Sequence, residues 1–527
     1  MQVTIKHDET LVIGSAKGFT AKYVEEAPLY FGQGVQDIDQ KRGLSINGPA
    51  DSKRDELFTI RIGIVSTGQG SQDITSCLQR LNRDPVPSSG SKPFVTQSFP
   101  GFEMAFRCRL VMAPGYNEEI PTKEVERLLQ TKNPETRIKR AAELYAMKVG
   151  IICRRVSVPD VIICHEPERI EVECGAGMVG SAREMTLSAA DKKEAKHIRE
   201  MVETHKILAP LHESTRNLLD MAVHQDFRRV LKAKCLDYDV PTQILTQSVL
   251  NILTEKDAKL SRRLRQQDRS TIAWNLAVAL YYKANHFPWR VGYIKDGTCY
   301  IGVSFYQDQT TREKYMCSSL AQVFSDIQEG MVVRGKSFKW DTRTLGQPHL
   351  TEEKAVEILS DALDVYREHH NDQNPNRVVL FKTSKYLDPE RRGFLAACRD
   401  VPKYDFVSIS DGRDVFFYRN GEKAVLRGAC IELGGESVLI YTKGYIPYQR
   451  SYQGPRVPRP LEITEHYGDT PLDEIAKETL ALSRLDWNTT DYCCYLPITL
   501  KFARRVGEVL GQIPEDKDIK QQYRFYM

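Results

Sequence analysis

The sequence predicts an α/β protein built from two successive domains. A buried strand at Leu57–Val65, a glycine-bearing turn and a helix at 72–81 form the usual opening of an α/β domain. From Arg290 onward the pattern changes to several short apolar strands with helices between them. At 527 residues the chain is long enough for two or three separate cores.

The composition is that of a reduced globular protein. Charged residues make up 27% of the chain and hydrophobic residues 41%, which excludes a disordered chain. The net charge of +4 neither requires nor excludes nucleic acid, since a basic channel can lie within a nearly neutral total. Twelve cysteines without a CxxC pair indicate structural thiols in a cytoplasmic chain. Met1–Ile5 lacks a signal-peptide core, and no stretch approaches the roughly 20 apolar residues of a membrane span.

The first half predicts alternating strands and helices. The turn at Ser66–Gly70 lacks the GxGxxG pattern, and no GxxxxGK[ST] motif occurs, so we interpret it as a tight turn at a strand end. A nucleotide bound at Gly68–Gly70, in a metabolic α/β enzyme, is the alternative. An amphipathic helix at Ile272–Lys283 stops before Pro288. The other expected elements are helices near 122–149, 189–206 and 227–232, and strands at 161–164 and 240–244.

The second half predicts more strands, with helices spaced between them. This order, ending in a terminal helix, suits an RNase H-like α/β layer. We place the boundary between the two domains near Arg290. The expected strands are 299–306, 330–340, 377–382, 414–418, 424–433 and 437–441, and the expected helices are about 351–370, 388–399, 473–483 and 497–511.

One polar constellation has the chemistry of an anion site. Arg228 and Lys232 are four residues apart, so they share one face of a helix. Gln243 begins a strand, and Lys283 ends a different helix. An arginine, two lysines and an amide that converge could bind a phosphate, whereas the plainer interpretation is a solvated basic helix face.

These segments resemble the MID domain of prokaryotic Argonautes. The likeness rests on Arg228-(x3)-Lys232-(x10)-Gln243, on the phrase Val240–Gln243, and on the run from Asn275 through Lys283 to Trp289. The resemblance implies that Arg228, Lys232, Gln243 and Lys283 bind the 5′-phosphate of a guide strand. Many members have tyrosine or histidine at the place of Arg228. Family members often hold a magnesium ion between this glutamine and the terminal carboxylate, which implies Gln243 and Met527 here.

The later half resembles a PIWI domain, at Cys299–Tyr306, Arg377–Ser384, Ala481–Asn488 and Leu496–Val509. The resemblance covers nearly the whole chain and leaves little room for N and PAZ domains. It therefore implies a short Argonaute with a lead-in over 1–55, a Rossmann-like MID domain over 56–289 and an RNase H-like PIWI domain over 290–527.

The residues that would hold catalytic metal ions in a PIWI domain are replaced. Active members cut by a two-metal mechanism that needs acidic ligands. Ser304 and Thr383 stand at the places of two aspartates, and Arg504 stands at the place of the last ligand. Glu329 is a candidate for the family's glutamate. Because neutral hydroxyls are weak magnesium ligands and Arg504 adds a cation, we expect no nuclease activity.

The resemblance implies an RNA guide, a single-stranded DNA target and a partner chain with an APAZ domain. That partner carries the effector, a TIR or sirtuin-like NADase or a nuclease, which target recognition activates against plasmids and phage. A heterodimer is expected, and oligomerisation on target binding stays open. The alternatives are an active guide-directed nuclease and the nucleotide-dependent enzyme mentioned above.

Overall fold

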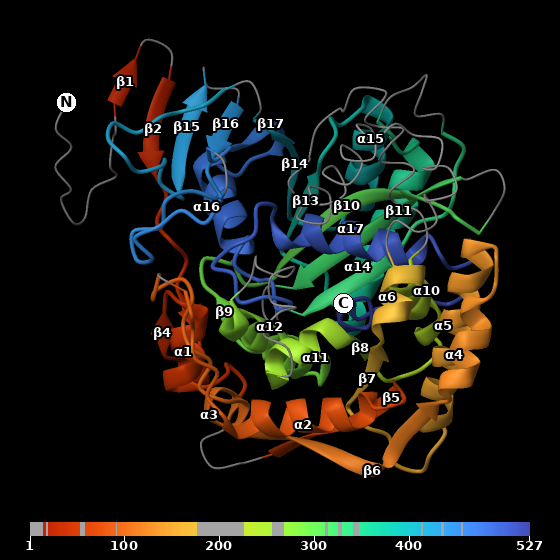
Figure 1. The fold of residues 1–527 in the computed structure, drawn as a ribbon. Coiled ribbons are helices and arrows are strands. Elements are labelled where there is room, and N and C mark those ends of the chain that lie inside the picture. The colour runs from red at the N-terminus through yellow and green to blue at the C-terminus, as the bar shows by residue number, and fades with distance from the viewer. Residues whose placement is uncertain are drawn as a thin grey trace, which may run out of the picture. The chain divides into compact units, whose positions relative to one another are not determined.

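The computed structural model describes two compact units, coloured along the chain in Figure 1. The parallel-sheet unit comprises Phe31–Trp289, Trp487–Thr490 and Arg524–Met527, and the mixed-sheet unit comprises Met1–Tyr30, Arg290–Asp486 and Asp491–Tyr523. The predicted lead-in over 1–55 is thus divided between them. The described residues are 14–16, 19–52, 58–90, 92–175, 226–255, 268–310, 315–324, 329–340, 347–412, 415–433, 437–454 and 457–527.

The parallel-sheet unit contains four parallel strands in the order β6-β5-β7-β8. Strand β7 is buried at every position, as expected for an inner parallel strand with both faces covered. The strands are β5 (Phe58–Thr67), β6 (Cys108–Ile120), β7 (Val161–Glu166) and β8 (Thr242–Thr246).

Helices flank this sheet, and α5 and α10 bury Ile138, Tyr145 and Leu231 against Ile162 of β7. The Rossmann-like prediction is therefore confirmed. The helices are α1 (Gln40–Asn47), α2 (Gly70–Arg83), α3 (Phe102–Phe106), α4 (Thr122–Leu129), α5 (Pro134–Cys153), α6 (Glu168–Cys174), α10 (Phe227–Cys235), α11 (Gln247–Thr254) and α12 (Arg269–Lys283). Short pieces η1 (Gly32–Gly34) and β4 (Gln36–Asp37) precede α1.

The mixed-sheet unit contains a ten-stranded sheet in the order β1-β2-β15-β16-β17-β14-β13-β10-β11-β12. Strands β10, β11 and β12 form an antiparallel meander, while β13 and β14 run parallel to β10. This is the expected RNase H-like layout. The strands are β1 (Gly14–Ala16), β2 (Phe19–Tyr23), β10 (Thr298–Gln307), β11 (Met316–Phe324), β12 (Gly330–Arg334), β13 (Arg377–Lys382), β14 (Lys403–Asp411), β15 (Ala429–Leu433), β16 (Ser437–Ile440) and β17 (Leu461–Gly468).

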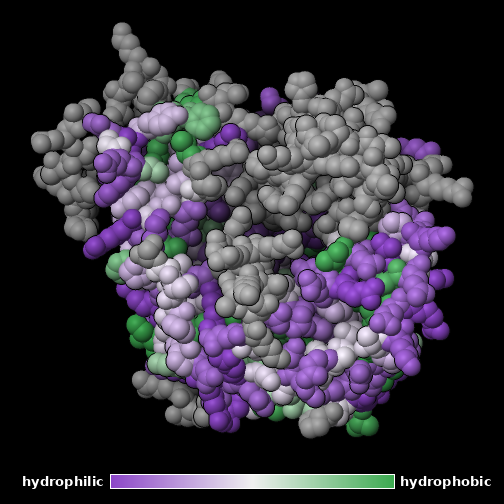
Figure 2. Space-filling view, in the orientation of Figure 1, coloured by the Kyte–Doolittle hydropathy of each residue, from purple (hydrophilic) through white to green (hydrophobic). Residues whose placement is uncertain are grey.

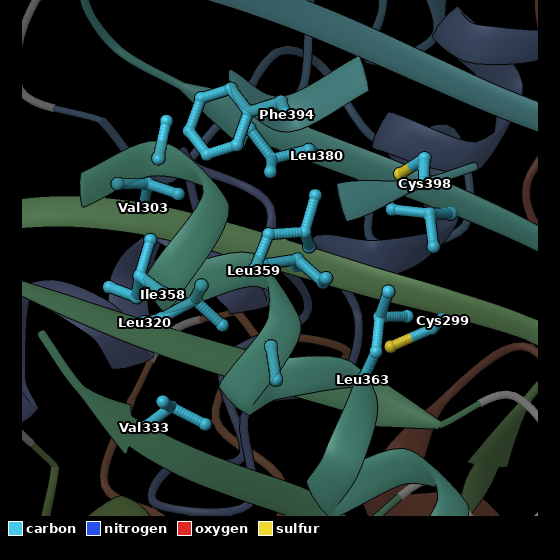
Figure 3. Packing of buried hydrophobic residues seen from close by; sticks show 14 of the residues in the cluster. Cys299, Val303, Leu320, Val333, Ile358, Leu359, Leu363, Leu380, Phe394 and Cys398 are labelled. Atoms are coloured by element: carbon cyan, nitrogen blue, oxygen red, sulfur yellow. The ribbon is translucent and has the colours of Figure 1, made fainter. Parts of the chain in front are cut away.

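Helices cover both faces of the central strands in this unit. Figure 1 shows α17 (Ile498–Leu510) lying across β10 and β11. On the other face, α14 (Glu352–His369) and α15 (Asp388–Ala397) close the core seen in Figure 3, where Leu359 and Phe394 pack near Val303. The remaining elements are α16 (Leu472–Leu482), the antiparallel pair β3 (Leu29–Tyr30) and β9 (Arg290–Val291), and η3 (Tyr523–Phe525).

Several sequence predictions differ from the structure. The expected strand at 414–418 is wrong, since residues 415–418 belong to no strand. Strands β6, β11, β14 and β17 were not predicted. The expected helix near 189–206 lies outside the described residues.

The surface and the thiols agree with the composition. Figure 2 shows a face on which hydrophilic residues predominate and hydrophobic ones form small, separate patches. All twelve cysteines are free thiols that are buried or half-buried. In the described part of the chain, no helix combines the length and apolar character that a bilayer crossing requires.

Candidate functional site

Three of the four predicted phosphate-binding residues meet in the parallel-sheet unit. Helix α10 begins at a cap where Asp226 accepts a hydrogen bond from the Arg229 amide, and Lys232 lies on its buried side. Gln243 is the second residue of β8, and Lys283 is the last residue of α12. The end of a helix suits a cation, because the helix dipole is negative there.

The two lysines converge on one main-chain oxygen, the carbonyl of Thr242. Lys232 Nζ donates to this oxygen, and Lys283 Nζ donates to it over 3.0 Å. Lys283 Nζ also donates to Gln243 Oε1 at 2.6 Å and to the main-chain oxygen of Met527 at 3.1 Å. Only 6% of Lys232 and 2% of Lys283 are exposed, so both ammonium groups are held away from bulk water.

The electrostatics of this lysine pair favour an anion. Burial lowers the pKa of Lys232 to about 8. A buried ammonium group is costly unless it is paired, and the oxygen that receives Lys232 belongs to a neutral carbonyl. A phosphate against both ammonium groups would add short, charge-assisted hydrogen bonds and offset that cost.

Arg228 does not join the lysine pair. Its side chain is 53% exposed, and its Nε donates to Glu166 Oε2 at 3.0 Å. Glu166 ends the inner strand β7 and is only 1% exposed. Burial raises the pKa of Glu166, and Arg228 opposes that rise. Arg228 thus neutralises a buried carboxylate.

The predicted magnesium ligands, Gln243 and Met527, do lie side by side. Both oxygens, however, accept hydrogen bonds from Lys283 Nζ. Magnesium requires six oxygen ligands in near-octahedral geometry, and two oxygens beside an ammonium group do not provide them. The observed donor set fits an anion, and the magnesium ion stays a prediction.

Asp51 anchors the turn that follows Lys283, a role that the sequence did not indicate. Its carboxylate accepts hydrogen bonds from the Tyr281 hydroxyl at 2.7 Å and the Phe287 amide at 3.0 Å. Its second oxygen also lies 3.0 Å from His286 Nδ1. Asp51 therefore fixes both sides of the end of α12, where Lys283 projects.

The glycine turn after β5 is explained by packing. A Cβ at Gly70 would lie 2.2 Å from the His165 ring, so the glycine makes room for that side chain. His165 in turn bonds with Thr67 Oγ1 at 3.2 Å and Gln247 Oε1 at 2.7 Å. The turn thus needs no bound nucleotide to account for its glycine.

In the mixed-sheet unit, Ser304 lies on β10 and Thr383 directly follows the neighbouring strand β13. Val303 of β10 is in register with Lys382 of β13, so the residues that follow stand at the same level. Helix α17 lies very close to this point: a Cβ at Gly302 would approach the Thr499 carbonyl carbon to 2.4 Å. Helix α17 therefore packs directly on the part of β10 that carries Ser304.

Arg504 adds a positive charge to the same helix. Its side chain is half-buried, and burial lowers its pKa to about 10, partly opposed by Glu508 one turn on. It therefore stays charged at neutral pH. Phe502, which stacks on Tyr523, lies on the opposite flank of α17. Among the described residues, no group of three or more histidine, cysteine or acidic side chains could hold a metal.

The structure argues against Glu329 as the missing glutamate. Gly330 pairs with Val323 of β11, and Val323 pairs with Tyr300 of β10. Glu329 is therefore near the level of Cys299, at the opposite end of β10 from Ser304. This placement separates Glu329 from Ser304.

A buried ion pair next to Thr383 escaped the sequence analysis. Lys382 Nζ donates to Glu390, and the two side chains are 1% and 0% exposed. Glu390 also accepts from the Leu350 amide at 2.9 Å and lies 3.2 Å from His349 Nδ1. The cluster ties the loop before α14 to the end of β13.

Comparison with known proteins identifies the fold. No protein-family model matches the sequence, and a comparison with curated proteins finds no relative. Among solved structures, Clostridium butyricum Argonaute bound to a guide DNA and a 19-mer target DNA matches with a TM-score of 0.60 and 14% identity. Drosophila Piwi matches with a TM-score of 0.56 and 14% identity, and A. aeolicus Argonaute with 0.50 and 12%.

The chain has the Argonaute fold. These matches cover 95%, 96% and 98% of this chain but only 54%, 56% and 55% of the solved chains. The chain thus spans about half the length of the structures it resembles. The matched half is the MID and PIWI part of the Argonaute fold.

Replacing Lys382 by methionine should destabilise the mixed-sheet unit by about 3–5 kcal/mol, because Glu390 would stay buried without its partner. Urea denaturation measures the loss. Arg392→Met is the control, since its pair with Glu352 is exposed on both sides and should change stability by less than about 1 kcal/mol. Equal losses of stability in the two variants would contradict the view that the Lys382–Glu390 pair stabilises the unit because it is buried.

Proposed function

We propose that this chain binds a guide strand by its 5′-phosphate and uses the guide to recognise a complementary strand, as a short Argonaute of the MID–PIWI type. The observation that carries the proposal is the convergence of Lys232 and Lys283 on the Thr242 carbonyl beside Gln243. A terminal phosphate offers several acceptor oxygens to such converging donors. Arg228 has a lesser part, because Glu166 already engages it.

The proposed guide is RNA and the proposed target is single-stranded DNA. Base pairing would read the sequence, while the protein holds the duplex by its shape and charge. The Clostridium butyricum structure contains a guide DNA and a target DNA, which supports the guide-and-target mode. Measuring the affinity for RNA and DNA guides of one sequence decides which of the two is the guide.

We also propose that the protein does not cut its target. Ser304 and Thr383 offer neutral hydroxyls, and Arg504 offers a cation, which suits a backbone phosphate better than a metal ion. The output would come from a partner chain with an APAZ domain and an NADase or nuclease effector, as a cytoplasmic heterodimer in prokaryotic defence. The sequence resemblance supports this part of the proposal.

Alanine at Lys232 or Lys283 should weaken the binding of 5′-phosphorylated guides at least tenfold and leave 5′-hydroxyl guides nearly unchanged. Charge-assisted bonds to phosphate contribute about 1.5–3 kcal/mol each. Lys234→Ala is the matched control, since Lys234 lies on the same helix but pairs with Glu143. Filter binding with both guide forms measures the effect. An equal loss for both forms would place the phosphate site elsewhere.

Guide affinity should also depend on pH through Lys232. Its lowered pKa of about 8 means that the empty site loses the ammonium charge above that pH, whereas bound phosphate favours the charged form. Affinity for 5′-phosphorylated guides should thus hold from pH 7 to 8 and fall by up to tenfold per unit above. Lys232→Ala should flatten this fall, and an unchanged profile in that variant would rule Lys232 out as its cause.

Incubation with a guide, a labelled target and magnesium or manganese should give no guided cleavage. Ser304→Asp combined with Thr383→Asp should not restore cleavage, since the glutamate and the last metal ligand would still be absent. Gel analysis of the target strand measures the product. The contradicting result is metal-dependent cleavage at one guide-defined position that is lost in Thr383→Ala. It would show that the region around Ser304 and Thr383 is catalytic.

A further inference from the structure

Two loops of the mixed-sheet unit form an exposed surface that the proposed function does not use. One is 415–423, which follows β14, and the other consists of residues 441–454 and 457–460, the described residues between β16 and β17. They contact each other: the Arg459 guanidinium lies 5.6 Å from the Phe416 ring, and Lys423 Nζ lies 5.1 Å from the Tyr445 ring. We call them the loop surface.

Side chains alternate between core and solvent along the first loop. Val415 and Phe417 pack against a small core that includes Tyr441, and the Phe417 amide donates to the Tyr441 hydroxyl at 3.1 Å. Phe416 and Tyr418 point outward, with 37% and 76% of their area exposed. The sequence predicts a strand at 414–418, where the residues after Asp414 form a short apolar run, yet residues 415–418 pair with no strand.

The two outward rings are well placed to act together. In an extended segment, side chains two residues apart stand roughly 6.5 Å from each other on the same face. Within the described part of the chain, Tyr418 makes no hydrogen bond and no ring contact. Its ring faces are therefore not occupied by a described side chain.

The surroundings of these rings are cationic. Arg419, Lys423, Arg450 and Arg459 are all exposed, and Arg450 stands at the tip of a tight turn with a φ of 49°. Arg459 lies 3.9 Å from Asp411. Within the described residues of the two loops, Glu422 is the one acidic side chain. An occupant of this surface should be anionic and should carry flat apolar faces.

We propose that the loop surface binds single-stranded nucleic acid, with bases stacked on Phe416 and Tyr418 and phosphates beside Arg419 and Lys423. Single strands combine exposed base faces with a charged backbone, whereas a duplex hides its base faces. Stacking on an aromatic side chain contributes without regard to base identity. The surface would hold unpaired segments of DNA or RNA and is independent of the phosphate site on the other unit.

The test uses labelled 5′-hydroxyl 15-mers of DNA and RNA, which do not depend on the phosphate site, and a DNA duplex of the same sequence. Tyr418→Ala in the full chain should weaken single-strand binding about tenfold in fluorescence anisotropy and leave duplex binding unchanged. Tyr418→Phe should bind like the original chain, because stacking needs the ring and not the hydroxyl. Tyr293→Ala changes another part-exposed tyrosine of the same unit and should have no effect.

Salt dependence separates charge from stacking. Lys423→Gln should reduce the slope of log affinity against log salt by roughly 0.7 for single strands, whereas Tyr418→Ala should leave the slope unchanged. Single-strand affinity that survives Tyr418→Ala would overturn the proposal, as would an equal loss for the duplex. Unchanged oligonucleotide binding with loss of a co-purifying protein or of self-association would assign the surface to that partner instead. The 5′-phosphate preference of the Lys232 and Lys283 variants can stand or fall separately.

Discussion

The structure of the proposed guide site depends on two buried ammonium groups that share one carbonyl oxygen. Lys232 comes from α10 and Lys283 from the end of α12, and both reach Thr242 at the start of β8. Holding like charges this close is unfavourable unless an anion joins them. The fold maintains the arrangement through Asp51, which fixes the turn beside Lys283 from a distant part of the sequence. This arrangement is the one that the proposed phosphate site requires.

The mixed-sheet unit depends on close packing between α17 and the central strand β10. Gly302 still allows the backbone of α17 to approach β10, and Ser319 Oγ donates to the Ala503 carbonyl at 2.8 Å to hold that helix. Ser304 lies on β10 beside this packing, and Thr383 directly follows the neighbouring strand β13. A nearby carboxylate, Glu390, is neutralised by Lys382 and withdrawn from solvent. Arg504 adds a positive charge to α17, as contact with a nucleic-acid backbone in the proposed function would require.

The sequence predicted those parts of the fold whose patterns are long and regular. The strand Arg377–Lys382 and the helix at 351–370 were located to within a residue or so, because apolar runs and helical periodicity mark them. Strand β17 was missed although Leu461 and Ile463 alternate with polar residues, a signal that could have found it. The strand expected at 414–418 is the reverse error, since this short apolar run packs Val415 and Phe417 inward but has no pairing strand.

The same distinction applies to the site: residues in a local motif were predicted, and residues whose partners lie far away in the sequence were not. Lys232, Gln243 and Lys283 were found through a motif that resembles a known family. The place of Arg228 was misjudged because it pairs with Glu166, 62 residues away in the sequence, and no local pattern reveals such a pair. Asp51 escaped for the same reason, since its partners lie more than 200 residues away.

The most direct test is to purify the chain after expression in a bacterium and to sequence the nucleic acid that accompanies it, with the chemistry of its 5′ ends determined. The account predicts short RNA strands that carry 5′-monophosphates and that are lost when Lys283 is replaced by alanine. Strands with mixed or hydroxyl 5′ ends, retained equally by the alanine variant, would contradict it.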